Sequence, residues 1–388
     1  NRLGVACVTR PVGGGAKAGN IEFARQELGA VGDALLVIFD ADQVAEEEFL
    51  VRTIPYFQDP SLGWVQTGQY YRNLENPVAR WANDQQGLFY GVLCPGKAKL
   101  NAAFICGTNV VLRASALDEI GGLPQDSVTE DFAASLLLHP RWRSLFLTEV
   151  LATGLGPMDI KSYFAQQGRW ATGTLGALRR HWRALLLPSR AGLTRPQKIQ
   201  YLLACTHYLS GLRDLIYLAV PFLFLLMGVS AIQGTTIPIF LTHFLPYWAL
   251  SQIAFWHASW RKTTFRGIIL SFGCFPVLLA SLLLVVVGQR TRFAITPKKR
   301  SGAKMGMPLF SQMLALGGCC VGLVMATASQ DDTPLVLLSA FWLLYMFFLL
   351  AGILWLGFRD WQTGNGKDAV KINVGPGDPP ADTSSESA

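Results

Sequence analysis

The sequence is poor in the residues that usually build metal centres and disulfide frameworks. Its five histidines are scattered, and its seven cysteines show no Cys-x-x-Cys spacing. Because four of those cysteines fall within apolar stretches, we expect free thiols, with neither a zinc site nor a disulfide framework. Metal ligation by histidine has equally little support.

The chain also lacks an initiator methionine and the apolar core of a signal peptide. It begins Asn1-Arg2-Leu3, and residues 3–8 already have the pattern of a strand inside a domain. We therefore expect a fragment in which the N-terminal part of the first domain is missing.

Charged residues make up only 15% of the chain, whereas 51% of it is hydrophobic. From about residue 200, apolar runs reach roughly 20 residues, the length that crosses a bilayer core. We predict membrane helices near residues 213–232, 237–258, 309–328 and 334–357. The net charge of +7 comes mainly from basic residues beside these runs, as expected for cytoplasmic loops of a multi-pass protein. We therefore expect membrane lipid as a partner, and no nucleic acid.

Three regions follow from these patterns. Residues 1–185 alternate short apolar runs with helical patterns, such as a helix over 21–28 and a strand over 34–39, which predicts a mostly parallel α/β sheet. Residues 186–363 form the membrane region. Basic clusters flank residues 265–288, so we expect this segment, broken near Gly273 and Pro276, to lie in the cytoplasmic interface. Residues 364–388 have too few apolar residues to fold.

Asp40-Ala41-Asp42 follows the strongest apolar strand. An extended Asp-x-Asp would point both carboxylates to one side of that strand, as two oxygen ligands for Mg²⁺ or Mn²⁺ on a diphosphate. The alternative interpretation is a solvated acidic turn.

Thr129-Glu130-Asp131 precedes a helical pattern over 132–138. A carboxylate presented there could act as a general base for a sugar hydroxyl. The structural alternative is a capping box formed by Ser127 and Glu130, with the acidic residues favoured by the helix dipole.

Two further segments could approach a ligand. Residues 13–20 are glycine-rich and carry Lys17, which suits close backbone approach to a nucleotide, although the pattern is not a Walker sequence. Residues 104–108 predict a buried strand that ends in a turn, where Cys106 is more often packing than chemistry. A flexible loop is the alternative for the glycine-rich segment.

Gln166, Arg169 and Trp170 are spaced to share one face of a helix between the two regions. An amide, a guanidinium and an indole on one face can hold a diphosphate and stack a sugar ring.

Taken in their order along the chain, the motifs resemble those of the processive family 2 glycosyltransferases, in particular bacterial cellulose synthase catalytic subunits. The resemblance extends from residue 1 to about 357. It is carried by Lys17-Ala18-Gly19-Asn20, Asp40-Ala41-Asp42, Phe104-x-Cys106-Gly107-Thr108, Thr129-Glu130-Asp131, Gln166-x-x-Arg169-Trp170 and Phe293-Ala294-Ile295-Thr296-Pro297-Lys298.

The resemblance implies a GT-A-type, Rossmann-like glycosyltransferase domain followed by a multi-pass helical channel. It makes Asp131 the catalytic base and assigns Asp42, with Asp40, to a Mg²⁺ or Mn²⁺ ion. It assigns the remaining matching positions to substrate binding: Lys17, Cys106, Gly107, Thr108, Glu130, Gln166, Arg169, Trp170, Thr296 and Lys298. Residues 289–304 correspond to a gating loop.

The implied activity is processive, inverting transfer of glucose from UDP-glucose to a growing β-glucan, with export across the bacterial inner membrane. The catalytic domain would be cytosolic, with a periplasmic or cell-envelope export partner. Synthases of β-1,3 or mixed-linkage glucan, hyaluronan or chitin share the core motifs, so these products remain open. Other readings are a membrane enzyme that adds a single sugar and a non-catalytic membrane scaffold.

Overall fold

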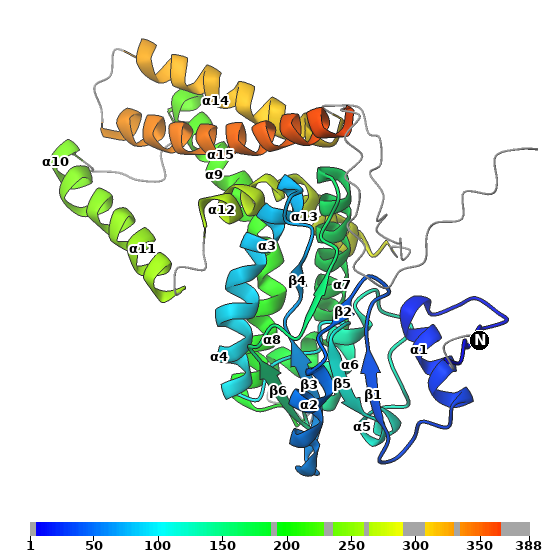
Figure 1. The fold of residues 1–388 in the computed structure, drawn as a ribbon. Coiled ribbons are helices and arrows are strands. Elements are labelled where there is room, and N and C mark those ends of the chain that lie inside the picture. Colours follow the sequence, from blue (N-terminus) through cyan, green and yellow to red (C-terminus); the bar gives the residue numbers. More distant parts are fainter. Residues whose placement is uncertain are drawn as a thin grey trace, which may run out of the picture.

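A computed structural model describes residues 5–187, 192–228, 236–259, 264–289, 307–329 and 334–365. An α/β domain is followed by a region built only of helices, which lies against one end of that domain (Figure 1). The order of the elements agrees with the predicted fold class, an α/β domain followed by helices, while the boundary at residue 185 stays a prediction.

The main sheet has the strand order β1-β5-β3-β6 and is mixed. Its strands are β1 (Leu35–Ile38), β5 (Val110–Arg113), β3 (Leu62–Thr67) and β6 (Arg143–Leu147). β3 and β6 pair in parallel, but β5 runs antiparallel to both of its neighbours, so only β1, β3 and β6 share the predicted common direction. The sequence could not reveal this reversal, because a strand buried on both faces reads as a continuous apolar run in either direction.

A smaller second sheet lies beside the first. It joins β2 (Val44–Ala45), β7 (Ala152–Gly154) and β4 (Tyr70–Tyr71), with β7 in the centre. β7 is antiparallel to β2 and parallel to β4. Its strands are too short to give a periodic signal, so the sequence did not predict this sheet.

Helices pack around both sheets. Those of the α/β domain are α1 (Ala16–Glu27), α2 (Phe49–Thr53), a 3-10 helix (Ile54–Gln58), α3 (Pro77–Leu88), a π-helix (Phe89–Leu93), α4 (Cys94–Lys99), α5 (Ala114–Glu119), α6 (Glu130–Leu138) and α7 (Ile160–Leu186). The predicted strand over 34–39 matches β1, whereas the predicted strands over 3–8 and 104–108 are wrong, because residues 5–8 and 104–108 are irregular and β5 begins only at Val110. The predicted helices over 21–28 and 132–138 match α1 and α6, although each helix begins earlier than expected.

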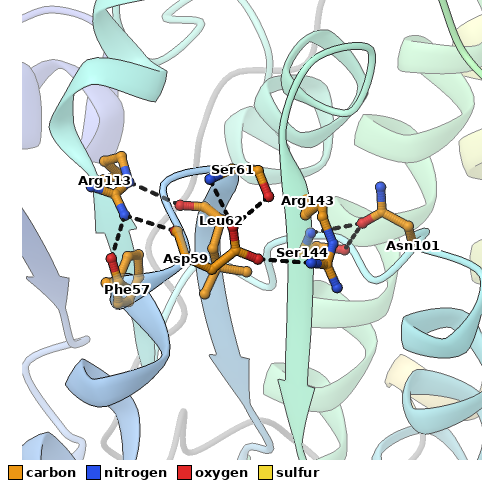
Figure 2. Close-up of polar contacts among 8 residues, drawn as sticks. All are labelled: Phe57, Asp59, Ser61, Leu62, Asn101, Arg113, Arg143 and Ser144. Carbon is orange, nitrogen blue, oxygen red and sulfur yellow. Dashed lines mark hydrogen bonds and ion pairs between the residues drawn. The ribbon is translucent and has the colours of Figure 1, made fainter.

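A buried arginine fixes the end of the main sheet that lies away from the candidate site described below. Arg113 donates from Nε to the carbonyl of Leu62 at 3.0 Å, and from Nη2 to the carbonyls of Phe57 and Asp59 at 2.8 and 3.1 Å (Figure 2). The Asp59 carboxylate in turn pairs with Arg143 on β6 at 2.7 Å. One guanidinium therefore satisfies three carbonyls where β3 begins and β5 ends.

The helical region contains α8 (Arg195–Thr206), a 3-10 turn (His207–Leu209), α9 (Ser210–Met227), α10 (Ile237–Ile239), a π-helix (Phe240–Phe244), α11 (Leu245–Ala258), α12 (Phe265–Gly273), α13 (Phe275–Val287), a 3-10 turn (Met307–Leu309), α14 (Phe310–Ala328) and α15 (Pro334–Asn365). By length and hydropathy, three helical stretches of the described chain could cross a membrane: Arg195–Met227, Phe310–Ala328 and Pro334–Thr363. The bent pair α12 and α13 also passes this test when it is taken as one broken span. The three stretches overlap three of the four predicted spans, although the first begins at Arg195 and not near residue 213.

The remaining predicted span, 237–258, is helical but is not among these candidates. His243, Gln252 and His257 lower its hydropathy, which explains the difference. The segment predicted to break near Gly273 does break there, because α12 and α13 bend by 43° at Cys274. Gln312 on α14 donates to the Gly273 carbonyl at 2.7 Å and so satisfies a backbone group at the bend. Its interfacial position stays a prediction.

Two of the predicted regions fall wholly or mainly on residues outside the described part of the chain. The predicted gating loop, 289–304, is described only at residue 289, and Thr296 and Lys298 therefore cannot be placed. The predicted tail, 364–388, is described only through Asn365, where α15 ends.

Candidate active site

The Asp-x-Asp motif lies in a turn and not in an extended strand. Its turn follows β1 and closes through a hydrogen bond from the Gln43 amide to the Asp40 carbonyl at 2.9 Å. The two carboxylates have different partners: Asp40 pairs with Lys17 at 2.5 Å, and Asp42 accepts a hydrogen bond from the Leu155 amide at 3.2 Å. The predicted extended conformation is wrong, because β1 ends at Ile38, before the motif begins.

Lys17 connects this turn to the loop before β5. Its ammonium group donates to the Asp40 carboxylate and also to the Gly107 carbonyl, each at 2.5 Å. Lys17 stands on the first turn of α1, which begins after Gly15 in the left-handed conformation, with φ of 60°. The glycine-rich segment therefore leads into a helix that brings a positive charge to the carboxylates.

The Cys106–Gly107 segment lies between the Asp-x-Asp turn and α6. Gly107 has φ of +81°, and a Cβ atom there would lie 2.9 Å from Oδ2 of Asp131. Gln66 accepts a hydrogen bond from the Cys106 amide at 2.7 Å, and Gln69 donates to the Cys106 carbonyl at 2.7 Å. A hydrogen bond with Cys94, together with burial, raises the pKa of the Cys106 thiol, so it stays protonated at neutral pH.

Glu130 and Asp131 occupy the first turn of α6 with perturbed acidity. Burial, followed by repulsion from Asp131, raises the pKa of Glu130 to about 7. Burial raises the pKa of Asp131 to about 6, while a hydrogen bond from the Phe132 amide and the charge of Lys17 act in the opposite direction. A carboxyl group that titrates near neutral pH suits general base catalysis.

The capping-box interpretation of this segment is wrong. The residue that precedes α6 is Thr129, and its side chain makes no capping hydrogen bond. Ser127 instead accepts a hydrogen bond from the Thr129 amide at 3.3 Å. The alternative that placed Glu130 in a capping role is thereby removed, although both acidic residues do lie in the first helical turn, where the helix dipole favours negative charge.

Helix α7 carries Gln166, Arg169 and Trp170, which we call the α7 face. The helix starts at a capping box in which Asp159 and Ser162 satisfy each other's backbone amides. Burial lowers the pKa of Arg169, while the charges of Asp40 and Glu130 raise it, so all three charged groups lie within electrostatic reach. The three α7-face residues are all partly buried.

The α7 face is also tied to the small sheet and to the helical region. Tyr71 on β4 is buried and interacts through its hydroxyl with Gln166 and Gln86; Gln86 donates to it at 2.7 Å. On the same helix, the Gly168 carbonyl accepts a hydrogen bond from the Ser281 hydroxyl on α13 at 3.3 Å. The predicted helix thus connects the charged site with the bent helix pair.

The structure brings most of the predicted site residues together around the ends of β1 and β5. Thr108 was predicted to bind substrate, but it is buried. Its hydroxyl accepts a hydrogen bond from the Asp40 amide at 2.8 Å and so contacts the turn. Residues that the sequence reasoning missed are Gln43, Gln66, Asn109 and Tyr71. The signal for Gln66 was available, since a lone amide within the apolar run 62–67 must find partners when the strand is buried.

The carboxylates of Asp40 and Asp42 are too few to hold a metal ion by themselves, but they suit a metal ion that a bound ligand also coordinates. Among the described residues, no three His, Cys, Asp or Glu side chains gather as a metal cluster. Asp40 and Asp42 offer two carboxylates on one turn, and Mg²⁺ is commonly held by one or two carboxylates together with substrate phosphates.

Comparison with known proteins gives a consistent result. Residues 35–358 match the family described as Glycosyl transferase family group 2. Cellulose synthase 1 of Komagataeibacter xylinus is 28% identical over 305 residues, covering 76% of this chain and 19% of the relative. The UDP-forming cellulose synthase catalytic subunit of Pseudomonas fluorescens (strain SBW25) is 29% identical over 295 residues, covering 72% and 38%. That of Xanthomonas axonopodis pv. citri (strain 306) is 34% identical over 223 residues, covering 55% and 29%.

The chain thus spans well under half the length of these three relatives. Among solved structures, the mannosyltransferase PcManGT from Pyrobaculum calidifontis, in complex with GDP-Man and Mn²⁺, has a TM-score of 0.43 at 17% identity, covering 71% of this chain and 68% of that one. That likeness is too distant to carry further detail. The family match, with the mixed sheets and the helices that follow, agrees with the predicted GT-A-type domain and helical region.

Proposed function

The chain belongs to glycosyl transferase family group 2, and from that membership we propose that it transfers glucose from UDP-glucose to the growing end of a β-glucan and exports the product through its membrane helices. The observation that carries the proposal is the placement of Asp131. Its carboxyl group has a pKa of about 6 and lies against Gly107, whose carbonyl accepts a hydrogen bond from Lys17, the partner of Asp40.

Asp131 is the proposed catalytic base. Its carboxylate accepts the proton of the acceptor hydroxyl while that oxygen attacks the anomeric carbon of the donor. The bond from that carbon to the UDP oxygen breaks in the same displacement, which inverts the anomeric centre. Glu130 precedes Asp131 in the chain, and its carboxyl group, with a pKa of about 7, interacts electrostatically with that of Asp131.

The donor diphosphate would lie near the charges that meet around Asp40. Lys17 and Arg169 supply positive charge, and Gln166 supplies an amide on the α7 face. Asp42, with Asp40, would hold a Mg²⁺ or Mn²⁺ ion, which when bound neutralises charge on the departing diphosphate. Held in place before the reaction, these groups stabilise the leaving UDP without reorganising.

The acceptor would lie where the α7 face meets Cys106. Trp170 is partly buried and offers an indole for stacking on the terminal sugar, with Cys106 close to that sugar. α7 contacts α13, so a chain that leaves Trp170 enters the helical region directly. Thr296 and Lys298 belong to the proposed gating loop on the strength of the sequence resemblance alone.

We place the catalytic domain in the cytosol and the helices in the bacterial inner membrane. The supporting observations are the three helical stretches able to span a bilayer and the basic clusters that flank residues 265–288. An export partner in the periplasm or cell envelope would receive the polymer.

The direct test supplies UDP-glucose or UDP-N-acetylglucosamine, with Mg²⁺ or Mn²⁺, to membranes carrying the protein in its full natural length. We expect an insoluble β-linked glucan from UDP-glucose, identified by linkage analysis. Asp131→Asn should abolish its formation. Asp126→Asn is the matched control, because Asp126 is an exposed carboxylate that pairs with Arg180 at 2.6 Å.

Each outcome of this test has a clear meaning. A β-1,4 product supports a cellulose-type enzyme, and β-1,3 or mixed linkages assign the chain to a related glucan synthase. Polymer formed only from UDP-N-acetylglucosamine would replace glucose as the substrate. Addition of one sugar to a lipid would overturn processivity, and an Asp131→Asn variant with unchanged function would favour a scaffold.

A further inference from the structure

Two consecutive residues of the loop before β5 hold both ends of the Asp-x-Asp turn. At one end, the Asp40 amide donates to the Thr108 hydroxyl at 2.8 Å. At the other end, Asn109 donates from its side-chain nitrogen to Oε1 of Gln43 at 3.1 Å. Because Gln43 closes the turn onto the Asp40 carbonyl at 2.9 Å, the contacts form a ring around the turn.

Asn109 is the centre of this ring, and its amide is fully engaged. Its Oδ1 accepts from the Thr108 hydroxyl at 3.1 Å, and its Nδ2 donates to the Gly68 carbonyl at 3.1 Å as well as to Gln43. The Gly68 carbonyl can only accept, which fixes the orientation of the Asn109 amide. Asn109 is completely buried, so no water competes for these bonds.

The backbone at Asn109 requires a residue that tolerates the left-handed region. Its φ is +54°, a conformation that asparagine adopts more readily than most residues other than glycine. Gln66 and Thr67 on β3 also donate to its carbonyl, at 3.3 and 3.1 Å. The backbone of Asn109 is therefore fixed by the buried strand β3 and not by the partly exposed turn.

We propose that Asn109 is a positioning residue that holds the Asp-x-Asp turn in its nucleotide-binding geometry through Gln43 and Thr108. The inference rests on the proposed function for the identity of the ligand, but the restraint on the turn does not depend on it. Asn109 is completely buried and acts on the turn through Gln43 and Thr108. Thr108 belongs to the same device, so its hydroxyl acts on the turn and not on the sugar.

The test compares two asparagines in the same backbone conformation. Asn101 also has a positive φ, of +49°, and its Oδ1 accepts from the Ser144 amide at 2.7 Å at the opposite end of the main sheet (Figure 2). Asn109→Gly and Asn101→Gly each keep the left-handed backbone while removing the side-chain hydrogen bonds. A general loss of stability should therefore affect both variants.

The first readout is hydrogen exchange of the amides in residues 40–43, which needs no ligand. Asn109→Gly should speed this exchange about tenfold or more, because the turn opens locally, and Asn101→Gly should leave it unchanged. Gln43→Ala should reproduce the effect. The double variant of Gln43→Ala and Asn109→Gly should add little, because both changes remove one contact.

The second readout is binding of UDP with Mn²⁺, measured by calorimetry on the purified full-length protein. Asn109→Gly should weaken binding about tenfold, the loss expected when roughly one hydrogen bond's free energy is removed. In the transfer assay, KM for the donor should rise while kcat changes less than about threefold. Asn101→Gly should match the unsubstituted protein in both assays.

The outcomes separate this inference from the proposed function. Unchanged exchange and unchanged UDP binding in Asn109→Gly overturn the inference and leave the proposed function intact. Equal effects of Asn109→Gly and Asn101→Gly also overturn it, because the role would then be structural only. If the unsubstituted protein binds no UDP, the proposed nucleotide site fails, and the exchange readout alone decides whether Asn109 restrains the turn.

Discussion

Replacing Asp131, the proposed catalytic base, should make the protein more stable. Burial raises the pKa of Asp131 from 3.8 to about 6. The folded state therefore disfavours the ionised form of Asp131. The free energy of unfolding is highest at low pH, where the carboxyl group is neutral, and this contribution is lost as the pH rises through 6. Each pKa unit corresponds to about 1.4 kcal/mol, which gives about 3 kcal/mol at pH 8. Because water still reaches part of the side chain, we expect Asp131→Asn to recover about 1–2 kcal/mol.

The gain should depend on pH in a defined direction. We expect Asp131→Asn to raise the unfolding temperature of the detergent-solubilised protein by about 2 °C or more at pH 8, with little gain at pH 4, where the native carboxyl is protonated. Activity should be lost at both pH values. Thermal scans at several pH values, paired with transfer assays, measure both effects.

Asp118→Asn provides a control of opposite sign. Asp118 accepts a hydrogen bond from the Gly32 amide at 3.0 Å and pairs with Arg25 at 2.5 Å, and these contacts lower its pKa. Its ionised form contributes stability above its unfolded pKa, so Asp118→Asn should lower the unfolding temperature at pH 8. Equal shifts for both variants, or a destabilised Asp131→Asn, would refute the assignment of a strained carboxylate.

Four further results are expected. The rate of glucan formation should fall about tenfold per pH unit below pH 6, as Asp131 takes up its proton; a flat profile would contradict its role. Gly107→Ala should lower kcat about 100-fold while UDP still binds, because its Cβ would lie 2.9 Å from Asp131. Trp170→Ala should release UDP without long polymer, and full-length product would count against acceptor stacking. Arg113→Met should lower the free energy of unfolding by about 2–4 kcal/mol, measured by denaturant unfolding, with unchanged donor KM.

The sequence predicted the fold well where periodicity is strong. β1, α1 and α6 occur where the apolar patterns place them, and the break between α12 and α13 follows from Gly273 and Pro276. The direction of β5 was beyond prediction, because a fully buried strand carries no directional signal. The small sheet was missed because it depends on pairing between β2 and β7, such as Val44 with Thr153, which lie far apart in the sequence, and no local pattern encodes such pairing.

Within the site, residue types were easier to predict than their partners. Helical spacing pointed to Arg169, whereas Glu130 and Asp131 were assigned to the site through the family resemblance; the structure places Arg169 within electrostatic reach of Glu130, and Glu130 within reach of Asp131. The ion pair between Lys17 and Asp40 joins α1 to the turn after β1, and no spacing rule predicts it. Asn109 was missed because its role depends on a left-handed backbone and three partners from separate segments.

Helix α7 connects the proposed catalytic site to the bent helix pair α12 and α13. Three residues before the α7 face begins, Tyr163 donates to Gln85 at 2.7 Å, and Gln85 donates to Ser271 on α12 at 2.8 Å. Farther along, the Gly168 carbonyl meets α13, where a Cβ on Gly168 would lie 3.2 Å from Val277. Helix α7 is therefore held on both sides of the bend between α12 and α13. We expect a change in that bend to move the groups proposed to hold the diphosphate and the acceptor sugar, so that the proposed transfer and the proposed export would be coupled through α7.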